Sequence, residues 1–83
     1  MGRQPDVEKV ALVTGAGRGI GLATARLFLK EGWRVALLDV DPALVDSAAA
    51  GLAAPDTVLS LHADVADEGD VTHAVAAVEA RFG

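Results

Sequence analysis

The sequence predicts an α/β fold in which three parallel strands alternate with three helices. Short apolar runs begin near Val10, Val35 and Val58, which are 25 and then 23 residues apart, a spacing typical of repeated strand–helix–strand units. The first two runs are apolar at every position, as strands are when helices cover both faces of a parallel sheet. Right-handed crossovers then predict the strand order 3-2-1, with the first two helices on one face and the third on the other.

The first strand is expected over Val10–Val13, and an amphipathic helix is expected from about Gly19 to Glu31. Gly32 should end this helix, because glycine readily adopts the left-handed conformation that follows a helix C-terminus. Apolar residues at the i, i+3, i+4 and i+7 positions of one helix face are expected to face the sheet. In this first helix the residues at these positions are Ile20, Ala23, Thr24, Leu27 and Phe28.

The second strand is expected over Val35–Leu38, followed by a helix that starts at Asp41-Pro42, an N-cap acceptor and a residue suited to the first helical position. The third run, Val58–Leu61, is half polar and fits a strand near a sheet edge. The third helix should begin at Asp67. The residues expected to face the sheet are Val45, Ala48, Ala49 and Leu52 in the second helix and Val71, Ala74, Val75, Val78 and Phe82 in the third.

The composition excludes several classes of function. With 7 basic and 12 acidic side chains among 83 residues, the formal charge is −5, so the chain is not expected to bind nucleic acid. The sequence has no cysteine, and His62 and His73 are expected to be structural or solvated, so no metal site is predicted. No apolar run approaches the length of a membrane helix and no signal-peptide core is present, so the expected location is the cytoplasm, or else another reducing compartment.

The most informative segment is the glycine-rich loop between the first strand and the first helix, Thr14-Gly15-Ala16-Gly17-Arg18-Gly19-Ile20-Gly21. Glycines permit a tight turn and close approach of the backbone to a ligand, and a helix N-terminus offers free N–H groups to a pyrophosphate. Such a loop could be only a flexible turn, but its place between a strand and an amphipathic helix favours dinucleotide binding. Gly15, Gly19 and Gly21 define a G-x-x-x-G-x-G pattern, and Gly17 is an additional glycine.

Asp39 ends the second strand 18 residues after Gly21, where a carboxylate can accept hydrogen bonds from both hydroxyls of an adenosine ribose. The alternative is a polar residue that only caps a strand end. Beside the glycine loop, ribose binding is favoured. It predicts NAD as the cofactor and NADP as the less favoured one, because the carboxylate would repel a 2′-phosphate. Arg18 could contact a phosphate or remain a solvated loop residue.

These motifs, with Asp64-Val65 after the third strand, resemble the N-terminal half of a short-chain dehydrogenase/reductase, from Val7 to Gly83. The resemblance implies a Rossmann-type three-layer fold of which this chain is the βαβαβα half. It also implies that Asp64 accepts a hydrogen bond from the adenine amino group, that the Val65 backbone reaches the adenine edge, and that Ile20 lies near the nicotinamide. Asp64 could instead only terminate a strand, and Ile20 could only begin the hydrophobic face of its helix.

The catalytic residues of that family are absent from this chain. The resemblance implies an active site with a tyrosine, a lysine four residues later, a serine and an asparagine, yet the sequence contains neither tyrosine nor asparagine. We therefore expect residues 1–83 to be a partial dinucleotide-binding domain, truncated before the fourth strand and not catalytic alone. The parent is expected to be a homo-oligomeric oxidoreductase that transfers hydride between nicotinamide and an alcohol or carbonyl.

A second interpretation is a non-catalytic nucleotide-binding or interaction module that is complete at 83 residues. In both interpretations the first strand lies at the border of the predicted sheet, with unpaired N–H and C=O groups along one side. We expect the remainder of the parent chain or a second copy to cover this edge.

Overall fold

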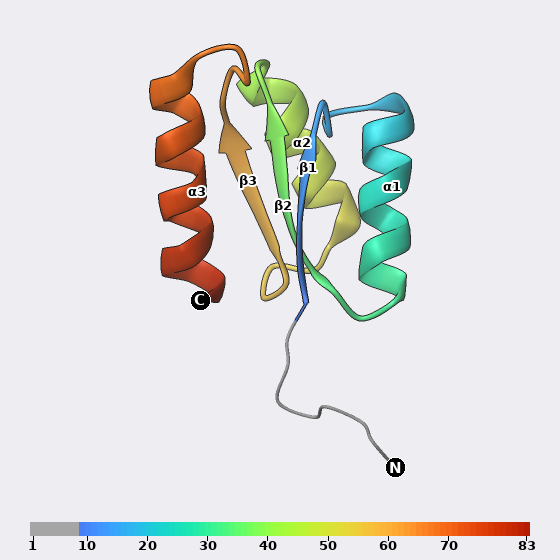
Figure 1. Cartoon of the computed structure of the whole chain (residues 1–83). Helices are drawn as coiled ribbons and strands as arrows, with labels where there is room; N and C mark the ends of the chain where they lie inside the picture. The colour runs from blue at the N-terminus through green and yellow to red at the C-terminus, as the bar shows by residue number, and fades with distance from the viewer. Residues whose placement is uncertain (1–8) are drawn as a thin grey trace.

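The computed structural model describes residues 9–83, in which three strands and three helices alternate (Figure 1). The elements are β1 (Val10–Thr14), α1 (Gly19–Lys30), β2 (Arg34–Asp39), α2 (Pro42–Leu52), β3 (Val58–His62) and α3 (Glu68–Phe82). β2 pairs in parallel with β1 on one side and with β3 on the other. The predicted fold class and the strand order 3-2-1 are therefore confirmed.

Helices cover both faces of the sheet and give three layers (Figure 1). The side chains of Val35–Leu38 in β2 alternate between the faces and are at most 2% exposed. On one face they pack with Ala25 of α1 and Val45 of α2, and on the other with Ala74 of α3. Burial of each large aliphatic side chain contributes about 1.5–3 kcal/mol, so β2 is the centre of the core.

Aspartate caps start two of the helices, as their sequences predict. Asp41 accepts a hydrogen bond from the Leu44 N–H at 3.1 Å, and Pro42 occupies the first helical position of α2. Asp67 accepts one from the Asp70 N–H at 2.9 Å at the start of α3. Each cap satisfies a helix N–H that has no partner within the helix.

The buried face of α1 differs from the predicted one. Ala25, Phe28 and Leu29 pack against the core. Three members of the predicted stripe are exposed instead: Ile20, Ala23 and Leu27. The reason is the close approach of Gly21 to the carbonyl of Gly15, because this contact fixes the rotation of the helix about its axis. Phe28, also predicted, is the member that does pack inward, whereas Ile20, Ala23 and Leu27 form a stripe of α1 that residues 9–83 leave uncovered.

Uncovered apolar residues also lie on the other face of the sheet. Ala11 and Val13 of β1 face α1 and α2, so Leu12 points to the opposite side, where it is 43% exposed. Val75 of α3, which the sequence predicts to face the sheet, is 42% exposed, because α3 packs mainly over β2 and β3. Within residues 9–83, the outer edge of β1 has no strand partner.

We predict that the isolated 83-residue chain self-associates, because the open edge of β1 adjoins exposed Leu12 and the exposed stripe of α1. Sedimentation velocity at micromolar concentrations should show a mass that rises with concentration. Leu27→Glu should weaken the association, whereas Arg26→Glu, on the same helix but outside the stripe, should change it less. A cooperatively folding monomer would contradict this prediction and would favour the self-sufficient module.

Candidate functional site

The predicted site residues all lie where the three strands end. Gly15–Gly21 follow β1, Asp39 ends β2, and Asp64 and Val65 follow β3. Because the strands are parallel, their carboxyl ends share one edge of the sheet, seen at the upper end of Figure 1. In open α/β sheets this edge is where ligands bind.

Two glycines of the loop are required by backbone conformation. Gly15 has a φ of +60° and Gly19 a φ of +62°, a region that residues with a Cβ atom adopt only at a cost. These two residues turn the chain from the end of β1 into the first turn of α1. The backbone conformation of these two glycines therefore sets the course of the loop.

Gly21 is required by close packing. A Cβ atom at this position would overlap the carbonyl oxygen of Gly15 and would lie 2.8 Å from its carbonyl carbon. Both groups belong to the backbone, so neither can move aside without changing the loop. The start of α1 is consequently held directly against the end of β1.

Gly17 joins the loop to the end of β2. Its N–H donates a hydrogen bond to Asp39 Oδ2 at 2.9 Å, and the N–H of Asp41 donates to Asp39 Oδ1 at 3.1 Å. A second link is the N–H of Ala16, which donates to the carbonyl of Leu38 at 2.9 Å. The half-buried carboxylate of Asp39 thus receives one backbone donor on each oxygen.

These hydrogen bonds lower the pKa of Asp39 below the usual value of a carboxyl group. The largest contribution comes from the Asp41 N–H and the next from Gly17, with partial burial opposing them and smaller favourable effects from the Val40 backbone and the charge of Arg18. Because the pKa is lower in the folded state, Asp39 stabilises the fold above its unfolded-state pKa. That stabilisation is lost as the pH falls through the folded-state pKa. At neutral pH the group is a carboxylate with acceptor capacity remaining.

The N-terminus of α1 differs from those of α2 and α3. Its N-cap is Arg18, whose extended backbone (φ −167°) precedes the helix and whose side chain makes no capping hydrogen bond. The first turn of α1 holds no acidic residue. This terminus therefore presents its partial positive charge without a neutralising side chain.

Asp64 stabilises the turn between β3 and α3. Its Oδ1 accepts a hydrogen bond from the Ala66 N–H at 2.9 Å, and its own N–H donates to Asp70 Oδ2 at 3.0 Å. The neighbouring Ala63 N–H donates to the carbonyl of Asp39 at 3.0 Å. The Ala63 bond ties the end of β3 to the end of β2, the Asp64 bonds hold the turn to the start of α3, and Val65 is left 56% exposed.

Val40 is a candidate site residue that the sequence analysis missed. It follows β2 directly and is 62% exposed, and the other exposed aliphatic residues at this edge are Ile20 (87%) and Val65 (56%). Each of the three strands is thus followed by an exposed aliphatic side chain, as expected at the rim of a ligand site. The available signal was an apolar residue placed between two aspartates, outside the buried run.

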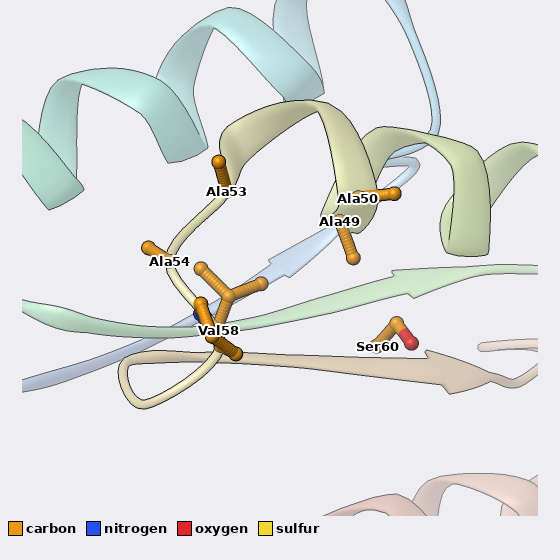
Figure 2. Close-up of a pocket in the computed structure, with 7 residues that line it drawn as sticks. Ala49, Ala50, Ala53, Ala54, Val58 and Ser60 are labelled. Carbon is orange, nitrogen blue, oxygen red and sulfur yellow. The ribbon is translucent and has the colours of Figure 1, made fainter.

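A separate hollow of about 330 Å³ lies between α2 and β3, toward the opposite end of the sheet (Figure 2). Small apolar residues and one hydroxyl line it: Ala49, Ala50, Ala53, Ala54, Pro55, Val58 and Ser60. The Ser60 hydroxyl already donates to Asp46 Oδ1 at 3.0 Å. No charged side chain lines this hollow, so it offers no group for acid–base chemistry or for binding a phosphate.

Other kinds of site are also absent from the described residues. No group of three or more His, Cys, Asp or Glu side chains within residues 9–83 is arranged to hold a metal ion. His62 and His73 are exposed. In the same part of the chain, none of the helices combines the length and the hydrophobicity that a membrane crossing requires.

Comparison with known proteins gives one consistent family. The family model described as short chain dehydrogenase matches residues 9–83. Momilactone A synthase of Oryza sativa subsp. japonica is 49% identical over 93% of this chain and 28% of its own length. The 2-(R)-hydroxypropyl-CoM dehydrogenase of Xanthobacter autotrophicus is 48% identical over 93% of this chain and 32% of its own length.

A solved structure agrees with the sequence comparisons. The 3-ketoacyl-(acyl-carrier-protein) reductase of Brucella melitensis, complexed with NADH, superposes with a TM-score of 0.84. It is 41% identical over 90% of this chain and 30% of its own chain. The chain therefore spans about three tenths of the length of these relatives.

We predict that Gly21→Ala destabilises the fold by about 1–3 kcal/mol or more, because the new methyl group would overlap the Gly15 carbonyl. Urea denaturation followed by circular dichroism measures the change. Gly51→Ala is the matched control, since Gly51 lies in α2 with open space around its Cβ position. This control should be neutral or stabilising by up to about 1 kcal/mol. Equal stability of Gly21→Ala and the unmutated chain would show that the contact does not shape the loop.

Proposed function

Because the chain belongs to the short-chain dehydrogenase/reductase family, we propose that it is the NAD-binding part of an oxidoreductase. The parent enzyme moves hydride between a nicotinamide and an alcohol or carbonyl carbon. The observation that carries this proposal is the ionised carboxylate of Asp39, held between the glycine loop and the start of α2. The NADH complex of the Brucella melitensis reductase supports a nicotinamide dinucleotide as the cofactor.

The glycine loop and the start of α1 fit the pyrophosphate of such a cofactor. A Cβ atom at Gly17 would overlap Asp39 and one at Gly21 would overlap the Gly15 carbonyl, so the compact shape of the loop requires glycine at both positions. The N-terminus of α1 has no capping side chain and supplies N–H donors and a partial positive charge. The pyrophosphate site is shaped by Gly15, Gly19 and Gly21. Exposed Ile20 lies on the side of this site that holds the nicotinamide.

The adenosine end of the cofactor fits the residues at the ends of β2 and β3, which are Asp39, Val40, Asp64 and Val65. The Asp39 carboxylate accepts hydrogen bonds from the two ribose hydroxyls with the lone pairs that its backbone donors leave. Asp64 accepts a hydrogen bond from the adenine amino group, and Val65 contacts the ring edge. Val40 adds an apolar contact beside Asp39, because its side chain is exposed at the same edge of the sheet.

The same carboxylate favours NAD over NADP. A 2′-phosphate brings a charge of about −1.5 to −2, which Asp39 repels at close range. Arg18 lies close enough to affect the pKa of Asp39, and its positive charge offsets part of this repulsion. We propose that the fixed carboxylate decides the preference, since Arg18 is exposed and screened by solvent.

This chain binds and orients the cofactor but does not carry out the proton transfer. When bound, the dinucleotide supplies the hydride chemistry. A hydride transfer to or from an alcohol also needs a group that exchanges the hydroxyl proton, and the chain holds no tyrosine for that role. We propose that residues 1–83 are a partial dinucleotide-binding domain and that the rest of the parent supplies the fourth strand and the catalytic residues.

Affinities for NADH and NADPH test the proposal. The unmutated protein should bind NADH more tightly than NADPH. Asp39→Ala should bind NADH about tenfold more weakly, and the difference between its affinities for NADH and NADPH should become smaller. Fluorescence titration of each reduced cofactor gives the dissociation constants. The control is Asp56→Ala, which removes an exposed carboxylate in the α2–β3 loop and should change neither dissociation constant. Tighter binding of NADPH than of NADH by the unmutated protein would refute the assignment of Asp39.

A further inference from the structure

We propose that Gly17 is a positioning residue that sets the preference for NAD by holding Asp39 in its ribose-accepting orientation before any cofactor binds. This inference rests on the proposed function and adds a role for the one glycine of the loop that is not part of the G-x-x-x-G-x-G pattern. It comes from the contacts of Gly17 with β2 and α2.

Gly17 is a glycine for reasons of space and not of backbone conformation. Its φ lies outside the left-handed region that Gly15 and Gly19 occupy, so an alanine could adopt the same backbone. However, a Cβ atom at Gly17 would lie 2.7 Å from Asp39 Oδ2 and 2.9 Å from the Cβ of Leu44. The missing side chain is therefore what allows the Gly17 N–H to reach the carboxylate.

The two neighbours of this missing Cβ differ in how easily they can move. Leu44 belongs to the first turn of α2, where its N–H is held by the Asp41 cap at 3.1 Å, so its Cβ can shift only if the helix shifts. The Asp39 carboxylate is the end of a side chain and can rotate. An alanine at position 17 would therefore displace Asp39 and break the hydrogen bond to Oδ2.

The hydrogen bonds orient Asp39 in advance. Oδ2 is held by the Gly17 N–H and Oδ1 by the Asp41 N–H, and both donors belong to the backbone. Each oxygen keeps a lone pair for a ligand hydroxyl. Because the side chain is already ordered, ribose binding does not have to restrict its rotation, and affinity is gained.

The same restraint makes Asp39 selective. A freely rotating carboxylate could turn away from a 2′-phosphate and leave Arg18, the residue next to Gly17, as the nearest charged group. With Oδ2 bound to Gly17, the negative charge stays at the ribose position and the phosphate must be accommodated against it. Gly17 thus determines which of the two charges, Asp39 or Arg18, the cofactor meets.

Binding measurements on Gly17→Ala test the effect on preference. The variant should bind NADH about tenfold more weakly, the loss expected for one hydrogen bond to a charged group. Its NADPH affinity should fall less or rise, so the ratio of the two dissociation constants should shift about tenfold toward NADPH. Gly51→Ala, in α2 with nothing within 4 Å of its added Cβ, should keep both values. An unchanged ratio in folded Gly17→Ala would overturn the proposal.

A titration without ligand tests the hydrogen bond separately. In NMR spectra of the unmutated protein, the Gly17 amide proton and the Asp39 carboxyl carbon should titrate with one midpoint, below that of an ordinary aspartate. Gly17→Ala should raise the Asp39 midpoint. If the chemical shift of the Gly17 amide proton in the unmutated protein does not change as Asp39 ionises, the proposal is overturned, even if the variant fails to fold. If the unmutated protein binds neither dinucleotide, the proposed function is refuted, and the titration still reports whether the hydrogen bond exists.

Discussion

The hydrogen bond from the Gly17 N–H to Asp39 Oδ2 joins two segments that lie 22 residues apart in the sequence. It can form only because the parallel pairing of β1 with β2 brings their carboxyl ends to one edge and because Gly17 has no side chain. The loop, the end of β2 and the start of α2 then share one contact region around the Asp39 carboxylate. Our interpretation of the site depends on this arrangement, since it places N–H donors for a pyrophosphate beside an oriented acceptor for a ribose.

The rest of the chain supports this edge, and within residues 9–83 the outer side of β1 has no strand partner. Val35–Leu38 of β2 are buried between α1 and α2 on one face and α3 on the other, so the position of this strand is well restrained. By contrast, Leu12 of β1 and Leu27 of α1 are exposed although both are apolar. A chain that spans about three tenths of its relatives' length would be expected to expose such residues where further strands and helices belong.

Much of the fold could be predicted from the sequence because its signals are local. The apolar runs, the caps Asp41 and Asp67 and the glycine loop each act within a few residues, and the structure contains the corresponding elements. The prediction of the buried face of α1 was wrong for most of its residues, because that face depends on the tertiary contact of Gly21 with Gly15. The periodicity of the sequence carries no information about this contact. For the same reason the contact of Gly17 with Asp39 and the exposure of Val40 became visible only in three dimensions.

The most direct test of the account is the location of the dinucleotide on the chain. Amide chemical shifts recorded during a titration with NADH should change at Gly15–Gly21, Val40 and Val65, around the carboxyl ends of the strands. They should stay constant at Ala49–Ser60, which includes the residues lining the hollow between α2 and β3. Changes centred on that hollow, with the glycine loop and Asp39 unaffected, would contradict the account.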